Sequence, residues 1–273
     1  MKFIDGITFV DMADSIFTME NGPETYFPYP NTFTSSSEGI VYTHTHTAKN
    51  LFPILKNIER KYVLVTHNVD MLVDENLYSQ LPPNVIKWYS ASITFQGEKL
   101  ESLPWGVESL QRFEFHHIDK RLKMTQKVLE PKNHRNLLYV KHSVWTNRKE
   151  RFKPYVLLKD KPFATVEQAA IFDFDHYIDS AYNHKFVLSP PGHAIDSHRT
   201  WETLYLNSIP IEKRNINNSF WRDLPICFVD DWEEITEDFL NKEYERITQM
   251  KWDMSKLTPE YWTNKIISEK NNL

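Results

Sequence analysis

The sequence predicts an α/β protein made of two domains, each built on a parallel β-sheet. Short runs rich in β-branched and aromatic residues alternate with helical segments, as they do in strand–helix–strand units. The chain has 273 residues, which suits two domains of ordinary size. The alternation pauses once, in a charged stretch before residue 136, and then resumes. These three observations together favour two consecutive α/β domains.

The first half of the chain is expected to open irregularly and then to form the first sheet. The first 35 residues contain Pro23, Pro28 and Pro30, which punctuate regular structure. The apolar runs that follow predict strands at 40–47, 61–67, 84–95 and 99–106. A helical connection is expected at 48–60, and the charged segment 108–135 is expected to be helical.

The second half repeats the alternation. Its apolar runs predict strands at 136–143, 185–190, 208–211 and 226–232. Helices are expected at 148–158, at 196–207, at 233–251 and at 259–270, the first of them broken near Pro154. We therefore predict an N-terminal domain over 1–130 and a C-terminal domain over 131–255. The terminal helix, within 256–273, is expected to pack back on the N-terminal domain.

Composition excludes several classes of protein. A hydrophobic fraction of 41% is enough for a core, and a net charge of −5 does not suggest nucleic-acid binding. The single cysteine, Cys227, excludes an intrachain disulfide and a cysteine-based zinc site. Asp5, Asp11 and Asp14 interrupt the N-terminus, and no run approaches the about 20 apolar residues that span a membrane. We expect a soluble, cytoplasmic protein with no membrane span, unless an anchor has been removed.

The stretch 185–211 carries the most chemical information. It is predicted to form a strand, a Pro-Pro-Gly turn, a helix and a second strand. Gly192 allows a close backbone reversal, and Asp196 or Ser197 is expected to cap the helix. A helix that begins at the carboxyl end of a parallel strand offers a binding site for a pyrophosphate.

Polar residues of this helix fall on one side. At about 100° per residue, His198, Arg199 and Glu202 lie within one wedge, whereas Trp201 and the apolar positions point toward a core. Arg199 or His198 would pair with phosphate oxygens, and Glu202 would accept ribose hydroxyls. An ordinary Arg199–Glu202 pair on the helix surface is the alternative interpretation.

The same stretch resembles the signature of exostosin-like glycosyltransferases. The matching residues are Phe186, Leu188, Pro190, Gly192, Asp196, Ser197, Arg199, Trp201, Glu202, Leu204, Ile209, Pro210 and Ile211. Two positions differ, because Pro191 replaces the family's usual arginine and Ala194 replaces a frequent glycine. Weaker similarity extends over residues 60–240, including the turn that contains Arg148 and Arg151.

This resemblance implies the GT-B fold, in which two Rossmann-like domains face a central cleft. It also implies inverting transfer from a UDP-sugar to a glycan acceptor without a metal or other cofactor, with UDP-xylose as a guess for the donor. The C-terminal domain would bind the donor through Ser189, Gly192, Ser197, His198, Arg199, Glu202, Arg148 and Arg151. Soluble enzymes of this type also occur in large algal viruses, which would place the protein in the host cytoplasm.

Inverting transfer needs a general base at the carboxyl end of an N-domain strand. Asp70 is our first candidate and Asp74 the second, while His44, His46 and His67 are further acceptor-side candidates. The alternative interpretation of Asp70 is the N-cap of a helix that begins at Met71.

Other functions remain open at this stage. Asp173 and Asp175 form an Asp-x-Asp pair, by which GT-A glycosyltransferases hold Mn²⁺ at the donor diphosphate. His44 and His46 form a possible metal pair with no visible third ligand. A non-catalytic glycan- or nucleotide-binding protein is also possible, and a phosphotransferase is less favoured because no Walker-type loop is present.

Overall fold

The chain folds into two compact units. The computed structural model describes residues 1–19, 29–109, 116–132, 136–167 and 173–271. The N-terminal unit comprises residues 2–112, 194–196 and 255–273. The C-terminal unit comprises residues 113–193 and 197–254, together with Met1. Each unit holds one parallel five-stranded sheet with helices, so the prediction of an α/β fold with two parallel sheets is confirmed.

The sheet of the C-terminal unit reverses its strand order near the middle. Its strands are β6 (Asn136–Lys141), β7 (Ala164–Glu167), β8 (His184–Leu188), β9 (Ile209–Lys213) and β10 (Cys227–Val229). They lie in the order β10-β9-β8-β6-β7, and every neighbouring pair is parallel. The chain therefore moves outward from β6 to β7 and then returns to β8 on the other side of β6.

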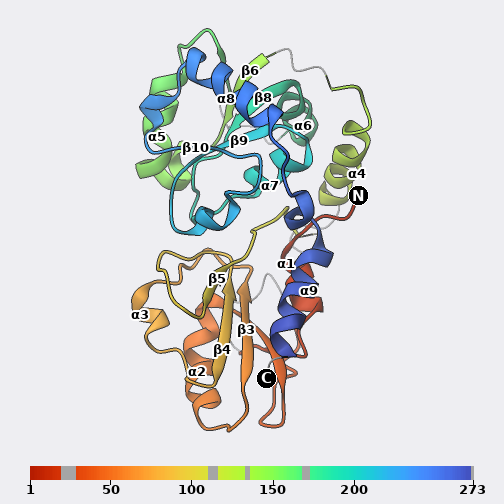
Figure 1. The fold of residues 1–273 in the computed structure, drawn as a ribbon, viewed down its shortest axis with the longest axis vertical. Coiled ribbons are helices and arrows are strands. Elements are labelled where there is room, and N and C mark those ends of the chain that lie inside the picture. Colours follow the sequence, from red (N-terminus) through yellow and green to blue (C-terminus); the bar gives the residue numbers. More distant parts are fainter. Residues whose placement is uncertain (20–28, 110–115, 133–135, 168–172, 272–273) are drawn as a thin grey trace. The chain divides into compact units, whose positions relative to one another are not determined.

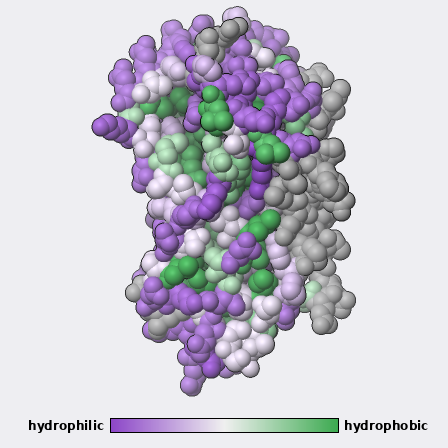
Figure 2. Space-filling model, turned by 90° about the vertical axis from the view of Figure 1, so that its right-hand side faces the viewer, coloured by the Kyte–Doolittle hydropathy of each residue, from purple (hydrophilic) through white to green (hydrophobic). Residues whose placement is uncertain are grey.

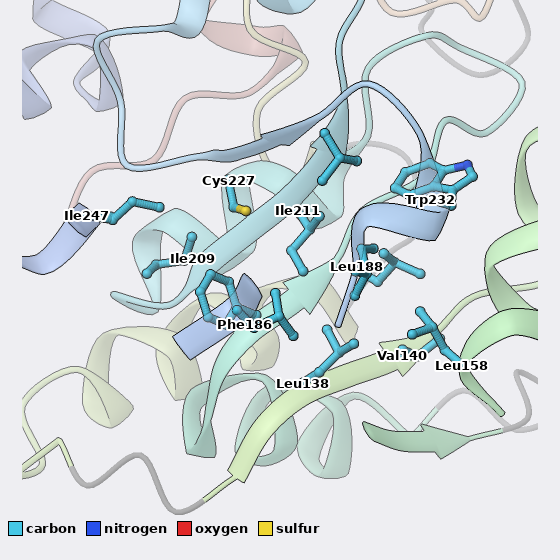
Figure 3. Packing of buried hydrophobic residues seen from close by; sticks show 13 residues of the cluster. Leu138, Val140, Leu158, Phe186, Leu188, Ile209, Ile211, Cys227, Trp232 and Ile247 are labelled. Atoms are coloured by element: carbon cyan, nitrogen blue, oxygen red, sulfur yellow. The ribbon is translucent and has the colours of Figure 1, made fainter. Parts of the chain in front are cut away.

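Helices cover both faces of this sheet (Figure 1). The helices of the unit are α4 (His116–Lys127), α5 (Arg148–Leu158), α6 (Phe174–Asn183), α7 (His198–Tyr205) and α8 (Glu237–Gln249). Figure 3 shows the core on one face, where Leu138 of β6 and Phe186 of β8 belong to the same buried cluster as Leu158 of α5 and Ile247 of α8. Tyr139 points to the opposite face and contacts Tyr177 of α6, with ring centroids 6.3 Å apart. Successive residues of a strand point to opposite faces of the sheet, so the side chains of one strand pack against the helices on both faces.

The sheet of the N-terminal unit has a different topology. Its strands are β1 (Ser15–Phe17), β2 (Gly39–His44), β3 (Tyr62–His67), β4 (Val85–Ser90) and β5 (Leu100–Ser102). They are parallel and lie in simple sequence order, β1-β2-β3-β4-β5. Right-handed crossovers that always advance in one direction place their helices on one face. That face receives α2 (Ala48–Lys56) and α3 (Glu75–Tyr78).

The other face is covered by helices from the two ends of the unit. These are α1 (Gly6–Asp11) and α9 (Pro259–Lys270), and α9 lies against β2 and β3 (Figure 1). Two adjacent residues of β4 point to the two opposite faces of the sheet. Trp88 packs on Phe52 of α2, whereas the Tyr89 hydroxyl donates to Glu269 of α9 at 3.5 Å. Lys270 of α9 also pairs with Asp14 at 2.6 Å.

Several predicted elements require correction. The first 35 residues are not wholly irregular, because α1 and β1 form there, with Asp5 capping α1. The short strand β7 was not predicted, since its residues are only partly buried. The helix α5 is continuous through Pro154 rather than broken. The helix α4 belongs to the C-terminal unit, where Lys123 and Lys127 both pair with Asp179 of α6.

The described surface is dominated by polar side chains. On the face in Figure 2, hydrophilic side chains cover most of the upper part, and hydrophobic ones lie in small separate groups. Within the described ranges, no helix combines the length and the apolar character that crossing a membrane requires.

Replacing Leu188 with alanine should strongly destabilise the C-terminal unit. Leu188 is fully buried between the two central strands and their helices, and such truncations cost about 2–5 kcal/mol. Leu129 is 82% exposed, so Leu129→Ala should change stability by less than about 0.5 kcal/mol. Urea unfolding of both variants measures the difference, and equal effects would contradict the assigned core.

Candidate functional site

The strand order of the C-terminal sheet reverses between β6 and β8, which makes this position a topological switch point. From β6 the chain passes through α5 to β7 on one side, and from β8 through α7 to β9 on the other. The loops that leave the carboxyl ends of these two strands therefore diverge. Ligands of open α/β sheets bind at such a switch point. Residues 142–147 after β6 and 189–193 after β8 flank this position.

Arg151 ties the two loops together. Its guanidinium is almost fully buried and donates only to backbone carbonyls. Nε donates to Pro191 O at 2.8 Å, Nη1 to Ser143 O at 3.1 Å and Nη2 to Pro190 O at 3.4 Å. Arg151 thus brings a guanidinium to the loop in which Pro191 replaces the arginine usual in exostosin-like enzymes.

Gly192 allows the two loops to approach closely. A Cβ atom at this position would lie 2.9 Å from Arg151 Nη2 and 3.8 Å from Thr146 Cγ2. The Gly192 carbonyl also accepts a hydrogen bond from Asn147 Nδ2 at 2.8 Å. Any side chain here would push against the guanidinium, so the glycine keeps the loops joined.

Three polar side chains around the switch point leave atoms without a hydrogen-bonding partner in the described part of the chain. They are Nε of Arg199, Nδ1 of His142 and Oγ of Ser189, and each of these atoms is buried. The side chain of Arg199 makes no ion pair with the described residues either, so the surface pair with Glu202, which was the alternative interpretation, does not form. Buried polar atoms are normally satisfied, and such a group of exceptions indicates a site for a ligand or water.

The charge of Arg199 shapes the electrostatics of this region. Burial and the Arg199 guanidinium lower the pKa of Arg151 to about 10. The same two causes lower the pKa of His142 to about 3, so His142 is neutral at pH 7. Its Nε2 lies 3.0 Å from Arg151 O, which can only accept, so Nε2 carries the proton and Nδ1 is an acceptor. The region around the switch point therefore combines the positive charges of Arg151 and Arg199 with a neutral acceptor on His142.

Helix α7 begins beside this charge. Ser197 is its N-cap, and its hydroxyl accepts from Arg199 N at 3.2 Å. Asp196 does not cap the helix, because its carboxylate accepts from Trp105 N at 2.9 Å within the N-terminal unit. The N-terminal end of a helix carries partial positive charge, which adds to that of Arg199.

Glu202 lies deeper than the sequence suggests. It is 3% exposed and forms an ion pair with Lys120 of α4. Burial raises the pKa of Glu202, but the charges of Lys120 and His198 and the hydrogen bonds from Lys120 and Tyr177 together outweigh it, and the net pKa lies below its ordinary value. Its predicted contact with ribose hydroxyls would have to compete with Lys120.

The other donor-side candidates lie around the same loops. His198 is half-buried in the first turn of α7. Arg148 begins α5, and its guanidinium lies over the rings of Trp145 and Phe152. The structure thus brings together Arg151, Ser189, Gly192, Ser197 and Arg199, with Arg148 one helical turn before Arg151.

The candidate bases lie in the loop after β3 in the N-terminal unit. Asp70 is exposed and does not cap a helix beginning at Met71, because no helix begins there. Asp74 instead caps α3 and accepts from Leu77 N at 2.8 Å. The carboxylate of Asp74 is therefore engaged in a structural role.

The three histidines form a cluster at the carboxyl edge of the N-terminal sheet. His44 and His67 are register partners at the ends of β2 and β3, and the rings of His44 and His46 stack at 5.6 Å. Burial, and then the neighbouring imidazoles, lower the pKa of His44 to about 4. His67 lies between Phe9 and Trp105 and contacts Pro104 O through Nε2 at 3.0 Å.

The Asp-x-Asp pair lies at the start of α6. Asp173 is the N-cap and accepts from His176 N at 3.0 Å, while Asp175 pairs with Lys123 at 3.3 Å. In the parts of the chain with described coordinates, no three His, Cys, Asp or Glu side chains are grouped so that they could hold a metal ion.

Two contributors to the site were not predicted. His142 directly follows the last residue of β6, and a polar residue directly after a buried strand is the sequence signal that could have identified it. Lys120 has no such signal, because it meets Glu202 across 82 residues of sequence.

No family model matches the sequence, and no curated protein matches it.

Replacing His142 with asparagine should flatten the pH dependence of stability. His142 is neutral in the folded protein down to about pH 3, whereas the unfolded chain takes up its proton near pH 6.5. Stability from this group is therefore present above pH 6.5 and is lost as the pH falls toward 3, by at most about 1.4 kcal/mol per pH unit.

Urea unfolding of the native protein and of His142→Asn between pH 7 and pH 4 tests this. The native protein should lose stability more steeply. His193→Asn is the control, because His193 is exposed to water. Parallel curves for the native protein and His142→Asn would contradict the assignment of a buried neutral imidazole.

Proposed function

We propose that this chain is an inverting glycosyltransferase with a GT-B arrangement. It would transfer a sugar from a UDP-sugar to a glycan hydroxyl in the cytoplasm, with UDP-xylose the first donor to test. The observation that supports this most is Arg199 at the start of α7, which forms no ion pair within the described residues and lies beside the two loops that Arg151 joins at the switch point. A nucleoside diphosphate matches this site in charge and in position.

The chemistry of such a transfer suits these groups. As the bond between the sugar and the diphosphate breaks, negative charge grows on the departing UDP. Arg199 and the N-terminal end of α7 would stabilise that charge, and preorganised groups of this kind dominate many rate enhancements. His142 Nδ1 would accept a hydrogen bond from a hydroxyl group of the UDP-sugar. In this proposal the guanidinium and the helix fill the role of a metal ion.

The N-terminal unit would supply the acceptor side. Asp70 is the favoured base, because it is exposed while the carboxylate of Asp74 is engaged in capping α3. The GT-A alternative receives less support, because Asp173 caps α6 and Asp175 pairs with Lys123.

Ligand-induced thermal stabilisation tests the proposal directly. UDP and one UDP-sugar should raise the melting temperature without Mn²⁺, since a ligand that binds only the folded state stabilises it. Arg199→Gln should weaken UDP binding roughly 10- to 150-fold, as expected for a lost charged hydrogen bond worth about 1.5–3 kcal/mol.

The matched control is Arg246→Gln, which removes an arginine already paired with Glu243 at 2.7 Å on α8. It should leave UDP binding unchanged. Stabilisation only with Mn²⁺ would favour the GT-A alternative. Binding of UDP without turnover of any UDP-sugar would favour a non-catalytic binding protein, and no response to any nucleotide would overturn the proposal.

Asp70→Asn should abolish most turnover while leaving the affinity for UDP unchanged. Loss of a general base typically slows the reaction about 10²- to 10⁴-fold. Asp74→Asn is the control, because asparagine is also a good N-cap and should preserve α3 and turnover. The measurement is release of UDP from the UDP-sugar that stabilises the protein most. A near-normal rate in folded Asp70→Asn would exclude Asp70 as the base.

A further inference from the structure

Trp145 is unusually exposed for a tryptophan in this chain. It is 79% exposed, whereas Trp201 and Trp221 of the same unit are fully buried. It lies in the loop between β6 and α5, within the short helical turn Val144–Asn147. Its ring therefore contributes little to the hydrophobic core, although it stands beside the switch point.

The loop that carries Trp145 is fixed on both sides of it. Two residues before, the Ser143 carbonyl accepts from Arg151 at 3.1 Å. Two residues after, Asn147 donates to Gly192 O at 2.8 Å and caps α5 by accepting from Glu150 N at 3.3 Å. The same contacts that join the two loops therefore hold an exposed indole at a defined place on their rim.

A cation supports this ring. The Arg148 guanidinium lies over the Trp145 ring at 5.4 Å from its centroid, and over Phe152 at 5.1 Å. Arg148 makes no ion pair with the described residues. The cation covers one face of the indole and restrains it, and the high exposure of Trp145 leaves the other face open.

We propose that Trp145 is the platform on which the nucleobase of the donor stacks. The inference rests on the proposed function and adds to it the side chain that contacts the base. Cγ2 of Thr146, the next residue, lies 3.8 Å from the position that a Cβ atom of Gly192 would take, so the loop that carries the indole lies beside the Gly192 turn. A nucleobase is separated from its diphosphate by a single ribose, and every base has a flat π-face that an aromatic ring can bind.

Binding of UDP and of inorganic pyrophosphate to the full-length protein, measured by calorimetry, tests this. The native protein should bind UDP more tightly than pyrophosphate. Trp145→Ala should weaken UDP roughly 5- to 100-fold, the range expected when a base loses its aromatic partner, and should leave pyrophosphate unchanged. Trp145→Phe should retain most of the affinity for UDP.

Phe152→Ala is the matched control. Phe152 is also exposed and contacts the same guanidinium, but it lies in α5 rather than in the loop between β6 and α5. The Phe152→Ala variant should keep UDP binding within about threefold of the native value.

The results of this experiment separate a failure of the stacking role from a failure of the proposed function. If Trp145→Ala keeps the full advantage of UDP over pyrophosphate, the stacking role is wrong and the donor site remains. If native protein binds UDP no more tightly than pyrophosphate, the base platform is wrong and only an anion site remains. If native protein binds neither ligand, both this inference and the proposed function are wrong.

Discussion

A parallel β-sheet has to be covered on both faces, and this single constraint accounts for the design of both units. In the C-terminal unit the strand order reverses at β6 and β8, and the core with α5 and α8 fills one face while α6 fills the other. In the N-terminal unit the strands advance in one direction, so α2 and α3 lie on one face and the other face depends on α1 and α9. The two units thus cover their sheets in different ways, and of the two strand orders only that of the C-terminal unit contains a switch point.

The candidate site follows from that solution. Because the connections from β6 and β8 run in opposite directions, their loops separate above the sheet, and Arg151 rejoins them through three backbone carbonyls. Carbonyl groups are neutral, so the Arg151 guanidinium keeps its positive charge when it donates to them. Arg199 adds a second positive charge nearby and thereby lowers the pKa of Arg151. Two like charges held together in a buried region store unfavourable energy that an anion would relieve.

Sequence patterns predicted the elements better than their arrangement. The helix expected at 259–270 forms with those bounds, because its apolar positions and its Thr258 cap are local signals. The sequence does not predict the strand β7, because its four residues include polar side chains that stay at least partly exposed and therefore form no apolar run. The order of strands leaves no trace in local composition, so the switch point between β6 and β8 was visible only in the fold. The partnership of Glu202 with Lys120 is similarly non-local, which explains why Glu202 was assigned to a ligand rather than to α4.

The position of α9 has a consequence for how the protein is made. This helix covers one face of the first sheet, yet it follows the entire C-terminal unit along the chain. A ribosome therefore completes the five strands of that sheet, and then the whole second unit, before the covering helix is synthesised. Until then, side chains such as Tyr89, which ends buried on the α9 side, remain accessible to chaperones and to neighbouring chains. The C-terminal unit, whose helices lie within its own sequence, is free to fold first, and the N-terminal unit reaches its native state only when the last segment arrives.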